Sequence, residues 1–142
     1  MTASKAALAL QLEPERRTWS RPTVRGKFLW VDGEKFFMRA VTYGPFRSDR
    51  FGTTYPALEI VEQDFAMMAA NGVNTIRTYN APPRWLLDVA QKHGLRVMVG
   101  LQAERHFAFL EDSKAIQDIH EQVRTGARRS AGHPAVLCRA RQ

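Results

Sequence analysis

The chain has 142 residues, of which 44% are hydrophobic and 25% are charged, and its formal net charge at pH 7 is +7. This length allows one domain whose core hides roughly 70% of the surface of the unfolded chain. No apolar run approaches the ~20 residues that a membrane-spanning helix needs, and the single Cys138 excludes an internal disulfide and a cysteine zinc cluster.

The positive charge gathers at the two ends of the chain. Arginine and lysine cluster in residues 16–27 and 124–141, whereas acidic residues roughly balance them in between. Nucleic-acid binders concentrate charge on one face and interleave it with aromatic residues, and neither pattern is visible. We therefore expect no nucleic-acid partner.

Residues 1–22 are predicted to be a flexible leader. The short apolar stretch 6–12 is followed by Glu13-Pro14-Glu15-Arg16, where a signal peptide would carry small residues for cleavage. The sequence thus gives no convincing signal peptide, and it leaves the location open between the cytoplasm and the cell envelope.

A β-hairpin is the first predicted element. Asp32-Gly33 stands between the apolar runs 27–31 and 34–39, and a type I′ turn needs positive φ at both central positions, which this pair tolerates. The second run continues to Tyr43 and breaks at Gly44-Pro45. We predict one long strand over 34–43, with residues 28–31 as its partner.

Three helix–strand units follow. Apolar residues at steps of three and four predict a helix over 57–71, before a strand over 73–79. Pro82-Pro83 opens a second helix that ends at Gly94, and residues 95–101 form a nearly continuous apolar strand of the type buried on both faces. The stripe predicted to be buried in the first helix is Leu58, Val61, Phe65, Met68 and Ala69.

The last unit is a helix from residue 112 or 113 to about Gly126, followed by a fourth strand that begins at Pro134 and runs to Cys138. Arg139 and Arg141 then occupy positions where a buried strand would place apolar side chains, and unpaired buried charges are costly. Residues 139–142 are therefore expected to be an atypical tail.

Strands that alternate with helices predict a parallel sheet of the α/β class. Residues 23–138 fit the N-terminal half of a (β/α)8 TIM barrel preceded by a short β-hairpin, or else an open doubly wound parallel sheet. A complete barrel needs about 250 residues, so the barrel interpretation makes this a partial barrel. The sequence pattern alone does not separate the two.

In both architectures, ligands bind beyond the carboxyl ends of the strands. The side chains expected there combine rings, a guanidinium, an amide and a carboxylate, which suits a polyhydroxylated ligand. Each has a structural alternative: packing for the tyrosines, an ion pair for the arginine, and solvation for the carboxylate. The candidate substrate-binding residues are Tyr43, Arg77, Tyr79, Asn80, Glu104 and His106.

No cofactor or metal is expected. The turn after the first long strand carries one glycine and a proline, whereas a phosphate-binding loop needs several glycines with free backbone N–H groups. No Gly-x-Ser-x-Gly or His-Glu-x-x-His spacing occurs. The histidines His93, His120 and His133 lie in or beside helices or ahead of a strand, so we assign them no catalytic role.

The ordered series of segments resembles the start of the barrel domain in family 2 and related clan A glycoside hydrolases. Asp32 to Tyr43 is similar to the hairpin, of the form Asn/Asp-Gly-Lys-x-Phe-x-Arg-Gly-Val, that leads into that barrel's first strand. Residues 64–79, 83–99 and 132–138 resemble the units that follow. A closer likeness is to bacterial glycoside hydrolase-like domains that accompany glycan-synthesising glycosyltransferases.

This resemblance implies a glycosidase or transglycosidase fold that acts on or binds β-linked glycans such as β-glucans. Arg77 would be the clan's strand-two arginine, which supports the catalytic carboxylates. The sugar subsites would be lined by Tyr43, Tyr79, Glu104 and His106.

Two departures from the family pattern matter. Ala103 stands where related domains often place a tryptophan, so a stacking platform is missing. The clan's acid/base glutamate, in an Asn-Glu pair that ends strand four, would fall just beyond Gln142, and its nucleophile on strand seven would lie further still. Glycoside hydrolysis needs both carboxylates.

We therefore expect a truncated glycoside hydrolase-like domain that binds β-linked glycans and is inactive by itself. Two alternatives stay open: a non-catalytic carbohydrate-binding or accessory module of a glycan-synthesising system, and a complete open α/β domain that binds an unrelated small ligand. A half barrel also exposes strand edges, so self-association is expected.

Overall fold

The computed structural model describes residues 19–48, 54–101 and 113–141, and side chains as far as Leu137. An antiparallel sheet comprises β1 (Thr23–Arg25), β2 (Phe28–Val31) and β3 (Glu34–Lys35). A parallel sheet comprises β4 (Ala40–Thr42), β5 (Thr75–Thr78), β6 (Arg96–Leu101) and β7 (Val136–Arg141). The helices are α2 (Leu58–Ala70), α3 (Arg84–Lys92) and α4 (Ser113–Arg129). None of these helices is long and apolar enough to cross a membrane.

The predicted hairpin turn is confirmed. Val31 pairs with Glu34 across Asp32-Gly33, whose φ angles are 52° and 83°. A third strand, β1, which the sequence did not predict, adds to the hairpin through the pairing of Arg25 with Phe28.

The prediction of one long strand over 34–43 is wrong, because β3 and β4 belong to different sheets. The side chain of Asn74 binds the backbone between them. Its Oδ1 accepts from the Arg39 N–H at 2.8 Å, and its Nδ2 donates to the Phe37 carbonyl at 2.9 Å. In a continuous hairpin strand, the Arg39 N–H and the Phe37 carbonyl would bond to a neighbouring strand. Here the Asn74 amide takes that place, and the chain leaves the first sheet and enters the second.

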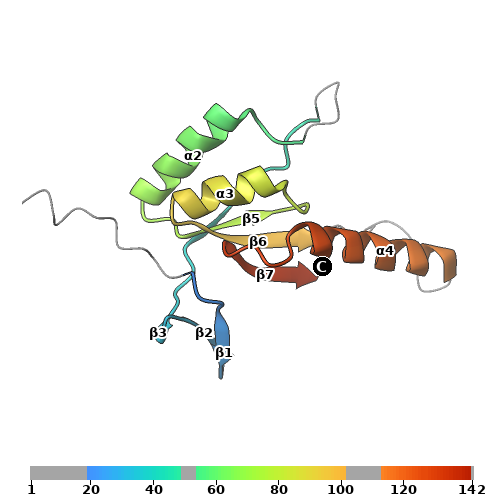
Figure 1. Cartoon of the computed structure of the whole chain (residues 1–142), viewed down its shortest axis with the longest axis horizontal. Helices are drawn as coiled ribbons and strands as arrows, with labels where there is room; N and C mark the ends of the chain where they lie inside the picture. Colours follow the sequence, from blue (N-terminus) through green and yellow to red (C-terminus); the bar gives the residue numbers. More distant parts are fainter. Residues whose placement is uncertain (1–18, 49–53, 102–112, 142) are drawn as a thin grey trace, which may run out of the picture.

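The four parallel strands follow one another in the order β4-β5-β6-β7. Their helix-facing side chains, including Ile76, Val97 and Val99, form one core with α2 and α3. Figure 1 shows α2 and α3 on the same side of this sheet, with the β1–β3 hairpin apart from them on the other side. A doubly wound sheet reverses its strand order at a switch point. The described strands show no reversal, which is consistent with a partial barrel.

The predicted apolar stripe of α2 is buried at its centre, whereas α4 has no fully buried residue. Val61 and Phe65 of α2 are fully buried, but Leu58 is 48% exposed. Leu58 is the first residue of α2 and lies three positions before the fully buried Val61.

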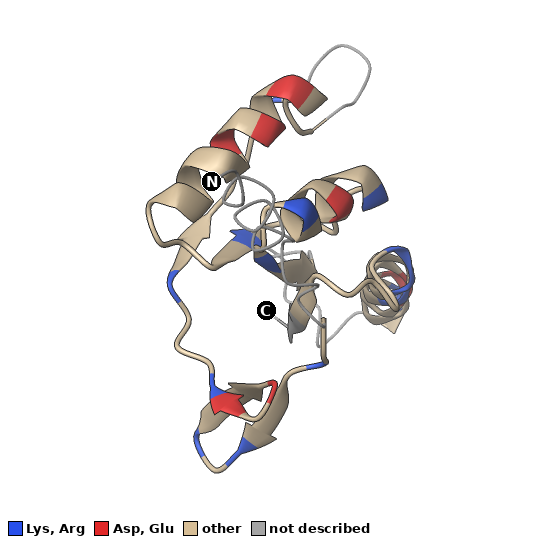
Figure 2. Cartoon of the chain, turned by 60° about the vertical axis from the view of Figure 1, so that its left-hand side comes forward, with Lys and Arg blue, Asp and Glu red and all other residues tan. Residues whose placement is uncertain are grey.

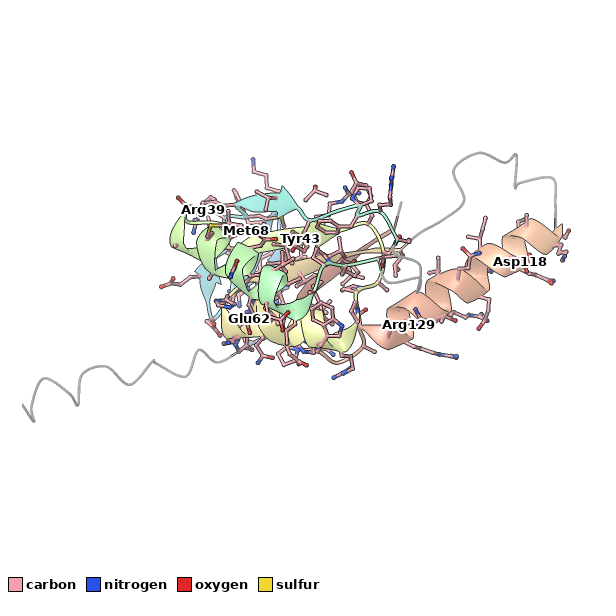
Figure 3. All side chains as sticks on the ribbon, turned by 90° about the horizontal axis from the view of Figure 1, so that it is seen from above. Arg39, Tyr43, Glu62, Met68, Asp118 and Arg129 are labelled. Carbon is pink, nitrogen blue, oxygen red and sulfur yellow. The ribbon has the colours of Figure 1, made fainter. Side chains whose placement is uncertain are left out.

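The third helix and the fourth strand are both longer than predicted. α4 continues to Arg129, and a Cβ on its Gly126 would lie 3.0 Å from Leu101 Cδ2, so the glycine lets the helix approach β6 closely. Figure 3 shows α4 projecting from the rest of the protein, with Arg129 at the near end and Asp118 toward the far end. β7 pairs with β6 as far as Leu101 and Arg141, so the backbone of residues 139–141 belongs to the sheet.

Candidate functional site

The candidate site lies at the carboxyl ends of β4 and β5, on the face of the sheet that the helices leave uncovered. Arg77 sits one position before the end of β5, in register with Thr42 on β4 and Met98 on β6. Because Ile76 faces the helices, strand alternation places Arg77 on the opposite face. Its guanidinium carbon lies 4.9 Å from the centroid of the Tyr79 ring.

This Arg77–Tyr79 pair is half-buried at both residues. A guanidinium over an aromatic face is a favourable contact, and it holds a flexible side chain against a ring. No ion pair joins Arg77 to a carboxylate in the described part of the chain. The pair therefore presents a planar group of hydrogen-bond donors beside an aromatic ring, which suits a ligand rich in hydroxyl or carboxylate oxygens.

Tyr43 lies in the core beside this site. Its side chain is 5% exposed, its ring contacts Phe46 and Phe65 with centroids 4.9 and 5.0 Å away, and its hydroxyl donates to Asp64 Oδ2 at 2.7 Å. Burial and then the bond to Asp64 raise the pKa of Tyr43. The phenol thus stays protonated and ties the end of β4 to α2. Its contact with a substrate stays a prediction.

Asn80 is held through its backbone. The Tyr55 hydroxyl donates to the Asn80 carbonyl at 3.2 Å, and the Tyr55 ring lies 6.2 Å from that of Phe46. Burial raises the pKa of Tyr55, so this hydroxyl is also a donor at neutral pH. Tyr55 and Asp64 were not among the residues picked from the sequence. Tyr55 stands between predicted elements and Asp64 on a helix, and neither position signals a contact with the strand ends.

Gly100 sets how closely β5 and β6 approach at the site. A Cβ at this position would clash with the carbonyl oxygen of Thr78, and would lie 2.5 Å from that of Tyr79. Real Cβ atoms do not come so close to backbone oxygens. Only glycine, which has no Cβ, therefore lets the backbone of Thr78 and Tyr79 lie this near to β6.

Glu104 and His106 lie outside the described residues, so their binding roles stay predictions. The described histidines at the opposite end of the strands make structural contacts: His93 Nε2 lies 2.7 Å from Glu62 Oε2, and His133 Nε2 lies 2.9 Å from Asp88 Oδ1.

Acidic side chains are absent from the described loops after β4 and β5, residues 43–48 and 79–83. Among the described residues, no group of three or more His, Cys, Asp or Glu side chains is placed to hold a metal ion. The described edge therefore offers donors and rings for binding, and no pair of carboxylates for proton transfer.

Comparison with known proteins supports the fold. No protein-family model matches the chain, and no curated protein matches it. Among solved structures, it is similar to Lactobacillus rhamnosus beta-glucuronidase, a TIM-barrel glycosidase, with a TM-score of 0.65 and 21% sequence identity. The match covers 84% of this chain and 21% of that chain. The chain thus spans about a fifth of the length of its structural neighbour, and the likeness shows a glycosidase-like fold.

Proposed function

We propose that the chain contributes the first four strands of a glycosidase-type (β/α)8 barrel and binds a β-linked glycan at the carboxyl ends of these strands. The observation that carries this proposal is the Arg77–Tyr79 pair, which lies half-buried on the uncovered face where barrel proteins bind their ligands. A sugar ring stacks on an aromatic face, and its hydroxyls accept hydrogen bonds from a guanidinium.

We propose that this chain binds the glycan and does not hydrolyse it. Such binding would serve equally in the barrel of a glycosidase and in a non-catalytic accessory module. Hydrolysis needs two carboxylates, about 5 Å apart for retention and roughly 6.5–9.5 Å apart for inversion. The described loops after β4 and β5 carry no carboxylate. The glycosidase-like fold of the structural neighbour supports a carbohydrate ligand and leaves the choice of glycan to experiment.

Calorimetric titration with short β-1,3- and β-1,4-linked glucose oligomers tests the proposal. We expect saturable binding, and a loss of about tenfold or more in affinity for Tyr79→Ala, because one stacking contact of ~1.4 kcal/mol corresponds to a factor of ten. Tyr79→Phe keeps the ring and should retain most of the affinity.

The matched charge control is Arg84→Ala, which removes an exposed arginine at the start of α3. It should bind like the unchanged chain, whereas Arg77→Ala should bind about tenfold more weakly. Equal losses for the two arginine variants would show a general charge effect, and no binding of any oligomer would reject the proposal. Turnover of a chromogenic β-glycoside by this chain would contradict binding without catalysis.

A further inference from the structure

Basic side chains gather on one face of the small antiparallel sheet. Strand pairing sets Arg25 of β1 opposite Phe28, and Lys35 of β3 opposite Trp30, so these four side chains share a face. The turn between β1 and β2 adds Lys27, whose Nζ lies 5.7 Å from the centroid of the Phe28 ring. We call this surface the cationic face, and it comprises Arg25, Lys27, Phe28, Trp30 and Lys35.

The basic groups of this face lie over its aromatic rings. Lys35 Nζ is 4.3 Å from the centroid of Phe28, and the guanidinium carbon of Arg25 is 5.1 Å from that of Trp30. Such contacts are favourable, and they hold long flexible side chains in place. No ion pair joins Arg25, Lys27 or Lys35 to an acidic group in the described part of the chain. The face therefore presents three positive charges that no neighbouring carboxylate neutralises.

The opposite face of the small sheet is acidic and apolar. Glu34 pairs with Val31 there, and strand alternation adds Leu29 to the same face. Leu29 and Val31 are half-buried, whereas the three basic residues of the cationic face are exposed. Burying unpaired charges is costly, so further barrel strands packed on this sheet would cover its apolar face. The exposure of the cationic face therefore follows from its own charges, however much of a barrel accompanies it.

We propose that the cationic face binds an anionic lipid surface. Anionic headgroups present many negative charges in one plane, and the basic groups of this face are likewise spread over β1, β3 and the turn that leads into β2. Each lysine or arginine near such a surface strengthens binding about fivefold. Tryptophan is typical of the headgroup region, and Trp30 lies among the basic groups. Figure 2 shows the small sheet at the opposite end of the molecule from α2. This inference does not rest on the proposed glycan binding, whose site lies at the carboxyl ends of the parallel strands.

The rings of this face favour lipid headgroups over a single-stranded nucleic acid. Proteins bind such strands by stacking bases on aromatic faces. The ammonium groups of Lys27 and Lys35 both lie over the Phe28 ring, so a base that stacked there would have to displace them. Headgroups need no free ring face. They meet basic side chains that the rings already hold in place, and this lowers the entropy lost on binding.

Co-sedimentation of the full chain with lipid vesicles tests this proposal. We expect salt-sensitive binding to vesicles of equal parts phosphatidylcholine and phosphatidylglycerol, and about 100-fold weaker binding to pure phosphatidylcholine. Lys27→Glu/Lys35→Glu should weaken binding about 25-fold or more, because two of the three basic groups are lost. The matched control is Arg124→Glu/Arg128→Glu, which changes the net charge equally at exposed positions of α4. It should bind almost like the unchanged chain, since charges away from the contact are screened. Circular dichroism verifies that both variants fold.

Three outcomes overturn the proposal. They are no binding to the mixed vesicles, equal binding to pure phosphatidylcholine, or equal losses for the two double variants. Oligothymidylate and polygalacturonate, at matched charge concentration, test the other polyanions. Tighter binding to either polymer than to the mixed vesicles assigns the face to that polymer and rejects the lipid surface. Arg25→Ala should weaken vesicle binding about fivefold, whereas Arg25→Lys keeps the charge and should retain it. Equal losses for these two variants would show that the charge at position 25 does not bind the headgroups.

Discussion

The Tyr43 hydroxyl donates a 2.7 Å hydrogen bond to the Asp64 carboxylate, and this bond joins the end of β4 to the middle of α2. Hydrogen bonds to charged groups contribute about 1.5–3 kcal/mol to folding. We predict that Tyr43→Phe lowers the free energy of unfolding by about that amount, because the ring packing stays while a half-buried carboxylate loses its donor. Urea denaturation at neutral pH measures the change.

The double variant Tyr43→Phe/Asp64→Leu serves as the control for this bond. Removing both partners leaves no unsatisfied buried group, so the double variant should be more stable than Tyr43→Phe alone. If the two variants unfold at the same urea concentration, the bond does not contribute in the way the geometry indicates.

Gly100 provides the second prediction. Gly100→Ala should cost about 1–3 kcal/mol of stability, since its Cβ would meet the rigid backbone of Thr78 and Tyr79. Gly126→Ala is the matched control, because the tightest contact of the Cβ there is with the flexible end of Leu101, and alanine favours a helix by up to about 1 kcal/mol. Thermal unfolding compares the two, and a cost at Gly126 that equals the cost at Gly100 would argue against a backbone clash.

The order of the elements could be predicted because periodicity and turn residues are local. The step of three and four over 57–71 identified α2, and Asp32-Gly33 identified the hairpin turn, which the structure confirms. The alternatives of a barrel and a doubly wound sheet could not be separated in this way. That distinction depends on which face the helices cover, and it is decided by contacts between residues far apart in the sequence.

Single long-range contacts account for the features that local patterns do not predict. Asn74 binds the backbone at Arg39 and Phe37, more than thirty positions earlier, and divides the predicted long strand into two. Tyr43 ends a strand, as a ligand-binding residue would, yet a carboxylate on α2 draws its hydroxyl into the core. Among the picked site residues, the Arg77–Tyr79 contact was within reach of sequence reasoning, because residues two apart on a strand share a face.

Arg96 gives the third prediction. Its side chain is buried at 6% exposure, its guanidinium lies 4.7 Å from the Trp19 ring centroid, and it donates to the Ser20 carbonyl at 3.0 Å. Burial lowers the pKa of Arg96. Arg96→Met should release the segment at Trp19 from the start of β6 and cost about 1–3 kcal/mol.

Acrylamide quenching of tryptophan fluorescence measures this release, because Trp19 should become more accessible to acrylamide in Arg96→Met. Arg84→Ala, which removes an exposed arginine, should leave quenching unchanged. Unaltered quenching in Arg96→Met would show that other contacts hold the segment.

The fourth prediction concerns the stability of the fold at acid pH. The Glu62 carboxylate bonds to Lys92 Nζ at 2.8 Å and to His93 Nε2 at 2.7 Å, and these two bonds lower its pKa from the ordinary value of 4.5. A carboxylate with a lowered folded-state pKa binds protons more weakly in the folded chain than in the unfolded one. Its contribution is therefore complete above pH 4.5 and is lost as the pH falls below that value.

Glu62→Gln should flatten the fall in stability below pH 4.5, and it should lower stability at neutral pH, because the amide keeps no charge for its basic partners. Glu59→Gln removes a carboxylate from the same helix that makes no ion pair in the described structure, so it should keep the acid slope of the unchanged chain. Urea midpoints measured between pH 3 and 7 compare the three proteins. If stability falls as steeply with decreasing pH in Glu62→Gln as in Glu59→Gln, the link between α2 and α3 does not depend on the Glu62 charge.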